Sequence, residues 1–371
     1  MKKKIEIIAF YLPQYHPFKE NDEWWGKGFT EWTNVGKAKP LFKGHNQPRV
    51  PTELGYYDLR LPIIREQQAQ MARDAGVTAF CYWHYWFGNG KRLIPEVFNE
   101  VLDSQKPDFP FCLGWANHSW YAKNWNSDGS ITQKILMEQT YPGVEDEKMH
   151  FNFLLKAFRD ERYVKIDGKP LLYIFDPIHL PIEYLQNFKK WTRESGFKDL
   201  YLVANITDSR YEKNEFLDKG YDAVSYQRLG RSTRSGVKLE DKIWRRLSKW
   251  KDKLKGIIIH RPPFIEDYQK VYHNLIIETD RAEDVIPVIL PQWDHTPRSG
   301  WNGTLLINAN PTTFYSHCKE ALNIVKDKEN PILFLKSWNE WGEGNMMEPD
   351  LTYGRGFIEA LKRAVDEYEL L

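Results

Sequence analysis

Short apolar segments alternate along the chain with amphipathic stretches, and this alternation restricts the possible folds more than any other feature of the sequence. The predicted strands cover residues 5–11, 77–83, 111–115, 170–175, 200–205, 223–226, 286–292 and 332–337. Most are apolar on both faces and rich in β-branched or aromatic residues, which is typical of parallel strands that are covered on both sides. The segments between them show helical periodicity, such as the apolar stripe within 151–158.

Eight such strands, each followed by a helix, predict a (β/α)8 TIM barrel of the α/β class that spans residues 1–371 as one domain. A further helix is predicted over residues 61–72, with Asp58 as its cap. The other predicted helices cover residues 91–103, 181–195, 211–219, 267–283, 312–327 and 357–365. An open doubly wound sheet is the alternative, although no Gly-x-Gly-x-x-Gly follows the first strand. Two long connections stand out, residues 12–57 after strand one and 227–264 after strand six.

The composition of the chain restricts its possible functions. The net charge of +1 gives no general attraction to nucleic acid. Aromatic residues make up 15% of the chain, with 15 tryptophans, which is more than a core alone needs and is common in carbohydrate sites. The three cysteines show no metal-binding or disulfide spacing, and we expect no cofactor and no metal.

No apolar run approaches the roughly 18 residues of a membrane span. The basic start of the chain resembles a signal peptide, but Glu6 and Pro13 interrupt its apolar run, so a first strand is the better interpretation. We therefore expect a cytoplasmic protein, or one that is peripheral to the inner membrane.

The connection after strand six is basic. Residues 228–261 hold 12 Lys or Arg and 3 Asp or Glu. Ile243, Leu247, Trp250 and Leu254 recur at helical spacing, so one interpretation is a helix that packs through this stripe while its lysines face water. The alternative is contact with an anionic surface or a lipid-linked glycan.

In a barrel, the groups that follow the strands converge on one face. Here nearly every strand end carries an aromatic ring and a hydrogen-bonding group, the mixture that a sugar needs. The predicted substrate-binding residues are Tyr11, Tyr15, Trp83, His84, Tyr85, Trp86, Trp115, Asn117, Trp120, Tyr226, Trp293, Asp294, Arg298, Trp338, Asn339 and Trp341. Three structural alternatives are that Trp83 and Trp86 plug the barrel mouth, that Asp294 pairs with Arg298, and that single histidines are structural. A metal site from His84, His118 and His295 lacks a supporting motif.

The last strand ends in Ser-Trp-Asn-Glu-Trp-Gly-Glu-Gly, which places Glu340 and Glu343 three residues apart between tryptophans. Two carboxyl groups beside aromatic walls are what cleavage or transfer of a sugar requires. An acid that faces its leaving group at pH 7 must keep its proton, so the pKa of Glu343 would have to be raised, by burial or by the second carboxylate. The alternative is that both are solvated loop acids.

Five motifs together resemble the WbsX-type family, which is often labelled glycosyltransferase and is related to glycoside hydrolase family 99, the endo-α-mannosidases and endo-α-mannanases. They are FYLPQYH at 10–16, GFTEW at 28–32, FCYWHYW at 80–86, WDHTPR at 293–298 and WNEWGEG at 338–344. The resemblance covers about residues 5–360. It implies a (β/α)8 barrel that retains anomeric configuration without a metal.

The resemblance also implies roles. Glu340 would deprotonate the substrate's own 2-hydroxyl, giving a 1,2-anhydro sugar, and Glu343 would be the acid/base. Gly342 stands where the hydrolases carry a histidine, which bears on the substrate more than on the mechanism.

The favoured hypothesis is a retaining endo-acting glycoside hydrolase, or transglycosylase, of a bacterial polysaccharide. A glycosyltransferase of surface polysaccharide biosynthesis (O-antigen or capsule) and a non-catalytic glycan-binding barrel are the alternatives.

Overall fold

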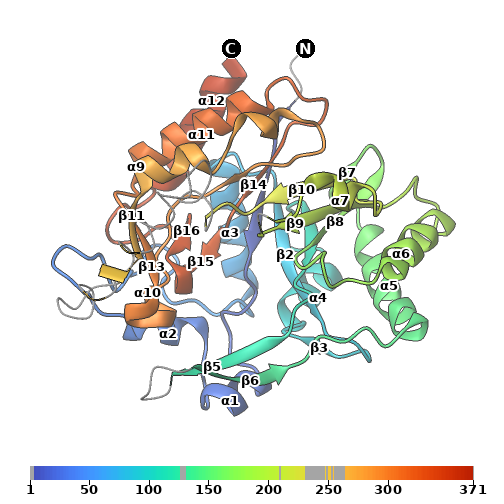
Figure 1. The fold of residues 1–371 in the computed structure, drawn as a ribbon, viewed down its shortest axis with the longest axis horizontal. Coiled ribbons are helices and arrows are strands. Elements are labelled where there is room, and N and C mark those ends of the chain that lie inside the picture. The colour runs from blue at the N-terminus through green and yellow to red at the C-terminus, as the bar shows by residue number, and fades with distance from the viewer. Residues whose placement is uncertain are drawn as a thin grey trace.

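Eight parallel strands follow one another around a sheet in the order in which they occur along the chain (Figure 1). The structure, a computed structural model, describes residues 4–125, 131–208, 210–229 and 264–370, together with residues 247, 250, 251 and 254. The strands are β1 (Glu6–Tyr11), β2 (Ala79–Trp86), β4 (Phe111–Trp115), β8 (Lys169–Ile174), β9 (Tyr201–Ile206), β10 (Ala223–Tyr226), β12 (Val288–Ile289) and β14 (Ile332–Leu335). Each forms parallel pairs with its neighbours, as the sequence predicted.

Backbone hydrogen bonds bring the two edges of the sheet together. On one side, the Val224 amide of β10 donates to the Asp284 carbonyl at 2.8 Å, and the Ile286 amide donates back to the Val224 carbonyl at 2.8 Å. On the other, the Phe334 amide of β14 donates to the Pro287 carbonyl at 2.9 Å. The sheet is thus nearly closed into a barrel. The predicted strand 286–292 shortens to β12 because Pro287 and Pro291, on either side of it, have no amide hydrogen for a ladder.

Helices cover the outside of the ring (Figure 1). They are α3 (Pro62–Asp74), α4 (Glu96–Ser104), α5 (Val144–Phe158), α6 (Ile182–Glu194), α7 (Lys213–Leu217), α11 (Pro311–Val325) and α12 (Gly356–Leu370). Most match the predictions, with two corrections. Asp58 does not cap α3, because its carboxylate accepts from the amide and guanidinium of Arg60 instead.

The predicted helix 267–283 is broken into α9 (Tyr268–Val271), η1 (Tyr272–Asn274) and η2 (Glu278–Arg281). Arg228 explains the break. Its guanidinium donates to the Leu275 carbonyl at 2.9 Å and binds both carboxylate oxygens of Asp280, at 2.5 and 2.6 Å. These contacts tie the segment to the end of β10.

Shorter elements lie in the connections between the strands and helices of the barrel. The connection after β1 holds α1 (Lys19–Trp25) and α2 (Glu31–Lys37), and the one after β4 holds a hairpin of β5 (Trp120–Trp125) and β6 (Ile131–Met137). The others are β3 (Arg92–Leu93), β7 (Lys165–Ile166), β11 (Phe264–Asp267), α10 (Thr296–Ser299), η3 (Gly300–Asn302), β13 (Thr304–Ile307), β15 (Asn339–Glu340), η4 (Trp341–Glu343) and β16 (Asn345–Met346).

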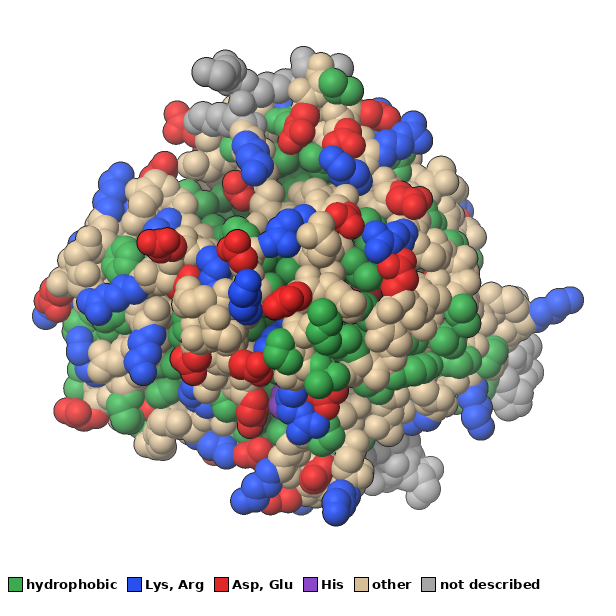
Figure 2. Space-filling model, turned by 180° about the vertical axis from the view of Figure 1, so that it is seen from behind, with side chains coloured by type: hydrophobic (Ala, Val, Ile, Leu, Met, Phe, Trp, Pro, Cys, Tyr) green, Lys and Arg blue, Asp and Glu red, His purple; other side chains and the backbone are tan. Residues whose placement is uncertain are grey.

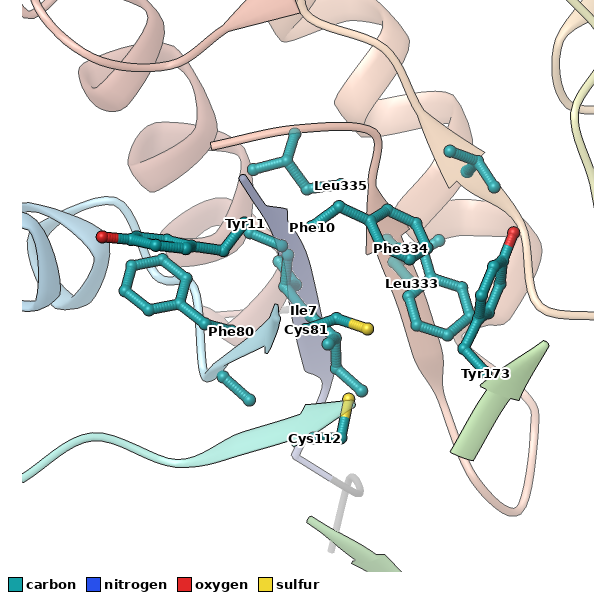
Figure 3. Close-up of a cluster of buried hydrophobic side chains, with 14 of the residues drawn as sticks. Ile7, Phe10, Tyr11, Phe80, Cys81, Cys112, Tyr173, Leu333, Phe334 and Leu335 are labelled. Atoms are coloured by element: carbon teal, nitrogen blue, oxygen red, sulfur yellow. The ribbon is translucent and has the colours of Figure 1, made fainter. Parts of the chain in front are cut away.

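The hydrophobic core has an inner and an outer part, and the pleat of the strands assigns residues to them. Figure 3 shows Phe10 pointing from β1 to the same side as Phe334 and Tyr173, while Tyr11 points to the opposite side with Phe80. The rings of Phe10 and Phe334 lie 5.1 Å apart inside the barrel. Side chains that alternate along a strand therefore belong to different environments.

The surface carries charges of both signs, interspersed over the face seen in Figure 2. Leu247, Trp250 and Leu254 of the basic connection are exposed, Trp250 by 64%. The predicted packing of the 243–254 stripe therefore does not hold for these three side chains, while Ile243 lies outside the described residues. No helix in the described part of the chain is long and apolar enough to cross a membrane.

Candidate active site

A tight turn after β14 carries both glutamates and is anchored to the loop that leaves β1. The Trp338 amide donates to the Phe10 carbonyl at 2.8 Å. The side chain of Asn339 binds the backbone of Leu12 twice, accepting from its amide at 2.8 Å and donating to its carbonyl at 3.0 Å. Because β1 and β14 are neighbours in the barrel, these bonds hold the turn over the carboxyl ends of the strands.

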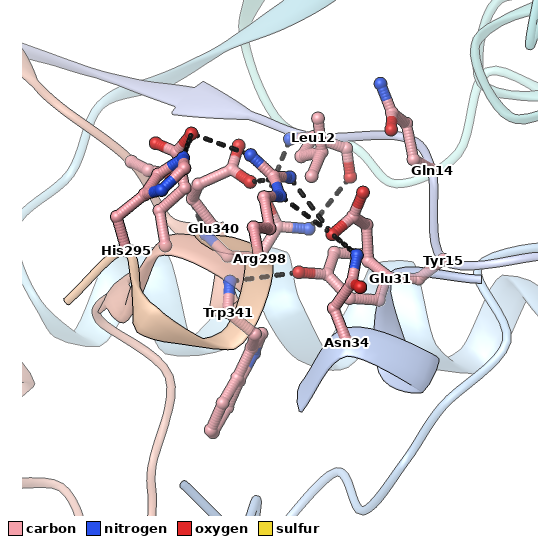
Figure 4. A network of polar contacts seen from close by, with 12 residues as sticks. Leu12, Gln14, Tyr15, Glu31, Asn34, His295, Arg298, Glu340 and Trp341 are labelled. Atoms are coloured by element: carbon pink, nitrogen blue, oxygen red, sulfur yellow. Dashed lines mark hydrogen bonds and ion pairs between the residues drawn. The ribbon is translucent and has the colours of Figure 1, made fainter. Parts of the chain in front are cut away.

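One guanidinium group connects three carboxylates at this end of the barrel (Figure 4). Arg298, on α10, donates at 2.6 Å to Oε1 of Glu340 and at 2.6 Å to Oε1 of Glu343. It also contacts Oε2 of Glu31 on α2, at 3.0 Å from its terminal nitrogen and 3.2 Å from Nε. His295 lies near the same group, with Nε2 at 3.6 Å from Glu343.

The two glutamates differ in exposure. The side chain of Glu340 is 11% exposed and that of Glu343 is 20% exposed. Burial, with the charges of Glu343 and Glu31, raises the pKa of Glu340 to about 8 against the opposing charge of Arg298. The sequence led us to expect a raised pKa at Glu343, the predicted acid, but the raised pKa lies at Glu340, the predicted base.

Lys336 completes the charged cluster. It follows β14 directly, and its ammonium donates to Oε1 of Gln227 at 2.8 Å. Burial lowers its pKa, although the charges of Glu343 and Glu340 oppose this effect.

Some predicted substrate-binding residues lie at the same end of the barrel as this cluster. Tyr85 accepts a hydrogen bond from Gln14 at 2.8 Å, and its ring meets that of Trp120 edge to face at 5.2 Å. Trp83 is half-buried and stacks on Phe10 at 4.8 Å. Half-buried Trp83 and Trp120 therefore offer aromatic surface near the mouth.

Tyr15, Trp293 and Tyr226 also belong to this end of the barrel. Tyr15 is fully buried, and its hydroxyl accepts from the Trp341 amide at 2.9 Å. Trp293 is half-buried and stacks on His295, while Tyr226 is half-buried beneath the guanidinium of Arg228. Tyr15 supports the turn, and the other two rings can face a ligand.

Five predicted aromatic or histidine contacts face away from the mouth, which corrects the prediction. Tyr11 and Trp338 are completely buried, and the Tyr11 hydroxyl donates to Gln68 of α3 at 2.6 Å. His84 lies 2.9 Å from His150 of α5, and burial lowers the pKa of His84 well below its usual value. Trp86 and Trp115 are also buried in the outer core, where Trp86 stacks on His150 and Trp115 contacts it edge-on.

Three further predicted residues serve as internal supports. Trp341 is fully buried, and its indole donates to Glu348 at 2.6 Å. Asn339 binds Leu12 as described above. Asn117 binds both the carbonyl and the amide of Asp176, at 2.7 Å each, which fixes the loop after β8.

Asp294 does not pair with Arg298, the alternative that the sequence left open. Its carboxylate accepts from His45 at 2.8 Å and from Gln47 at 2.7 Å, both in the connection after β1. Although burial opposes it, these bonds and one from the Thr296 amide lower the pKa of Asp294. A buried polar network thus holds the loop that carries Arg298.

Five residues of the site were not among the predicted catalytic or substrate-binding residues: Glu31, Lys336, Gln227, Gln14 and His295. Glu31 lies within one of the quoted motifs, next to Thr30, whose hydroxyl accepts from the Trp32 amide at the start of α2. That capping signal predicts a helix start but gives no hint of a partner 267 residues away.

The three histidines weighed for a metal are far from forming one cluster. His118 packs on Phe175, His84 binds His150, and His295 binds Ser299. In the described part of the chain, no group of three or more His, Cys, Asp or Glu residues is placed to hold a metal ion.

The fold agrees with the comparisons to known proteins. Residues 7–361 match the family described as "Glycosyltransferase WbsX", and the chain belongs to that family. The proteins named "Uncharacterized protein WxcX" from two strains of Xanthomonas campestris pv. campestris are 30% identical to it over 368 residues. The match covers 97% of this chain and 49% of each WxcX protein, so the chain spans about half the length of these curated relatives.

Solved structures show the same fold. A GH99 endo-alpha-mannosidase from Bacteroides thetaiotaomicron superposes with a TM-score of 0.60 at 15% identity, covering 98% of both chains. A "Glycoside hydrolase-like protein" gives 0.58 at 15% identity, covering 98% of this chain and 94% of its own. The chain is thus similar to TIM-barrel glycoside hydrolases in fold.

Proposed function

We propose that the protein is a retaining endo-acting glycoside hydrolase, or a transglycosylase, that acts on a bacterial polysaccharide through Glu340 and Glu343. The observation that carries this proposal is that both carboxyl groups bind one guanidinium at the barrel mouth. Sharing one planar group keeps them close together, and retaining enzymes hold their carboxyl pair about 5–5.5 Å apart. The half-buried rings of Trp83, Trp120 and Trp293, which lie at the same end of the barrel, suit the apolar faces of a sugar.

The proposed reaction proceeds through the substrate's own 2-hydroxyl. Glu340 removes the proton from O2, O2 attacks C1, and the glycosidic C1–O bond breaks while Glu343 gives its proton to the leaving oxygen. Water, or a sugar hydroxyl in transfer, then attacks C1 and opens the 1,2-anhydro ring. Glu343 takes the proton of the attacking group and Glu340 returns a proton to O2. Burial makes Glu340 a stronger base in its ionised form, which suits the first step.

Glu343→Gln tests the assignment. Removal of an acid/base catalyst typically costs about 10²–10⁴-fold in rate. We expect that loss in release of reducing ends from a bacterial polysaccharide or oligosaccharide panel, with unchanged thermal stability. The exposed Glu183→Gln on α6 is the matched control. Full turnover by the Glu343→Gln protein would refute the role, and wild-type binding without any product would favour a glycan-binding barrel.

A glycosyltransferase of surface polysaccharide biosynthesis is the second candidate, and the family description supports it. Such an enzyme would use a nucleotide sugar or a lipid-linked donor on the cytoplasmic side of the membrane. Nucleotide release from UDP-, GDP- or TDP-sugars, dependent on added acceptor glycan, would favour this candidate over hydrolysis.

We also propose that the basic connection approaches an anionic surface, such as the inner membrane face. Leu247, Trp250 and Leu254 support this, because exposed apolar side chains next to many lysines are what a membrane-surface segment offers. A lipid-linked glycan would present the same negative charge to this segment.

A further inference from the structure

Gly342, between the two glutamates of the turn, occupies a place where a larger residue would displace its neighbours. A Cβ atom there would collide with Oε2 of Glu31 and lie 2.9 Å from Nε of Arg298. Its backbone is outside the left-handed region that favours glycine. Space for the Arg298 and Glu31 side chains, and not backbone conformation, is therefore what requires a glycine here.

Glu31 reaches this position from a rigid support. It is the first residue of α2, whose start is closed by a capping box at Thr30. The next residue, Trp32, donates its indole N–H to the Tyr57 carbonyl at 2.7 Å, and Asn34 of the same helix lies within 3.4 Å of the Glu31 carboxylate. A buried carboxylate held this way presents a fixed negative charge to the guanidinium.

We propose that Glu31 and Arg298 form a positioning pair for Glu340 and Glu343, and that Gly342 is required because it admits this pair between them. The names of the catalytic roles rest on the proposed function, but the arrangement itself does not. Within the described residues, Arg298 binds only Oε1 of each glutamate of the turn, which leaves Oε2 of each for a substrate. Glu31 contacts Nε and the terminal nitrogen that also donates to Glu340, and so fixes the plane of the guanidinium.

The pair also controls the charge around Glu340. The groups that face Glu340 are Arg298 on α10, Glu343 on η4, Glu31 on α2, Lys336 after β14, and the hydroxyls of Tyr15 and Tyr85. Glu31 adds a negative charge, which favours the protonated form of Glu340, while Arg298 favours the ionised form. Removal of the Glu31 charge should therefore lower the pH at which Glu340 ionises.

The test is a titration of the Glu340 carboxyl in the protein without any glycan. Glutamate labelled with ¹³C at the side-chain carboxyl gives NMR signals, and the Glu340 signal is assigned by its loss in Glu340→Gln. We expect Glu31→Gln to lower the midpoint by about one pH unit or more. The control Glu23→Gln, an exposed acid on α1, should leave it unchanged.

Gly342→Ala provides the second variant. Its new methyl group meets the ends of flexible side chains, so the fold should survive while the pair is displaced. We expect the effect of Glu31→Gln on the midpoint to shrink at least two-fold in the Gly342→Ala background, whereas Gly36→Ala on α2, where nothing lies near, should preserve it.

Either of two results would overturn the inference: a Glu340 midpoint that Glu31→Gln leaves in place, or an effect of equal size in the Gly342→Ala background. If Glu31→Gln does not fold, Gly342→Ala alone tests the inference. A Glu340 midpoint that equals that of the wild type would then contradict the displacement of Glu31 and Arg298. These results are independent of turnover, so an inactive wild-type protein would refute the proposed function without touching this inference.

Discussion

Replacement of Glu348 should change how the stability of the protein depends on pH. This carboxyl is 3% exposed and accepts hydrogen bonds from Trp341 at 2.6 Å, Gln68 at 2.6 Å and Tyr57 at 2.8 Å. Burial nevertheless raises its pKa from 4.5 to about 7, because the three bonds compensate only part of the lost hydration.

The direction of this pH dependence follows from the difference between the pKa of Glu348 in the folded and in the unfolded chain. Below about pH 4.5 the carboxyl is protonated in both the folded and the unfolded chain, and its stabilising contribution is complete. As the pH rises through about 7, the unfolded chain ionises freely while the folded chain must ionise a buried group, so this contribution is lost. The difference between 4.5 and about 7 corresponds to about 3 kcal/mol, at about 1.4 kcal/mol per pH unit.

Glu348→Gln removes the titrating group and keeps the side-chain shape. For 371 residues the unfolding entropy is about 0.8 kcal/mol/K, so about 3 kcal/mol corresponds to about 4 °C in Tm. Between pH 5 and pH 8, calorimetry should show that wild-type protein loses about 4 °C more than Glu348→Gln. Glu183→Gln should lose as much as wild type. Parallel Tm–pH curves for wild type and Glu348→Gln would refute the reasoning.

Other predictions test the site and the surface. If Glu340 is the base and Glu343 the acid, kcat/KM for glycan cleavage should follow a bell-shaped pH profile with one limb near pH 8, and a profile that stays flat from about pH 7 to 9 would contradict this role. Trp83→Ala should weaken glycan binding about ten-fold in calorimetry through loss of ring stacking, whereas the outward-facing Trp86→Phe should not; equal losses would refute the assignment of the two faces. Trp250→Glu should reduce sedimentation with anionic vesicles several-fold, while Leu351→Glu, at another exposed apolar position, should not. Equal binding by wild type and both variants would remove the basis for the surface proposal.

The barrel could be predicted from the sequence because strands and helices leave patterns in neighbouring residues. Apolar runs long enough for a strand recur between amphipathic segments, and the predicted starts and ends of five strands lie within one residue of those of β1, β4, β8, β9 and β10. The main miss, the helix over 267–283, has a long-range cause. Arg228 binds the Leu275 carbonyl and Asp280, and no periodicity reveals such a partner.

The site was only partly predictable, for a reason visible in β2. Trp83 and Tyr85 point inward, while His84 and Trp86 point to the helices, as the two-residue period of a strand requires. All four lie near a strand end, and this position alone predicted the mouth for each, although the two-residue period sends alternate side chains to opposite sides. Gly114 fits the same rule, since a Cβ there would lie 3.1 Å from the inward ring of Trp83, and its neighbour Trp115 is buried on the outer side.

The buried tryptophans of the turn support the glutamates instead of contacting a sugar. Trp341 separates Glu340 on the mouth side from Glu348 on the helix side, and its amide and indole bind Tyr15 and Glu348. Burial raises the pKa of both acids, and Trp341 follows Glu340 directly in the chain while its indole binds Glu348. A change at Glu348 should therefore reach Glu340 through the position of Trp341, even though Glu348 itself faces away from any substrate.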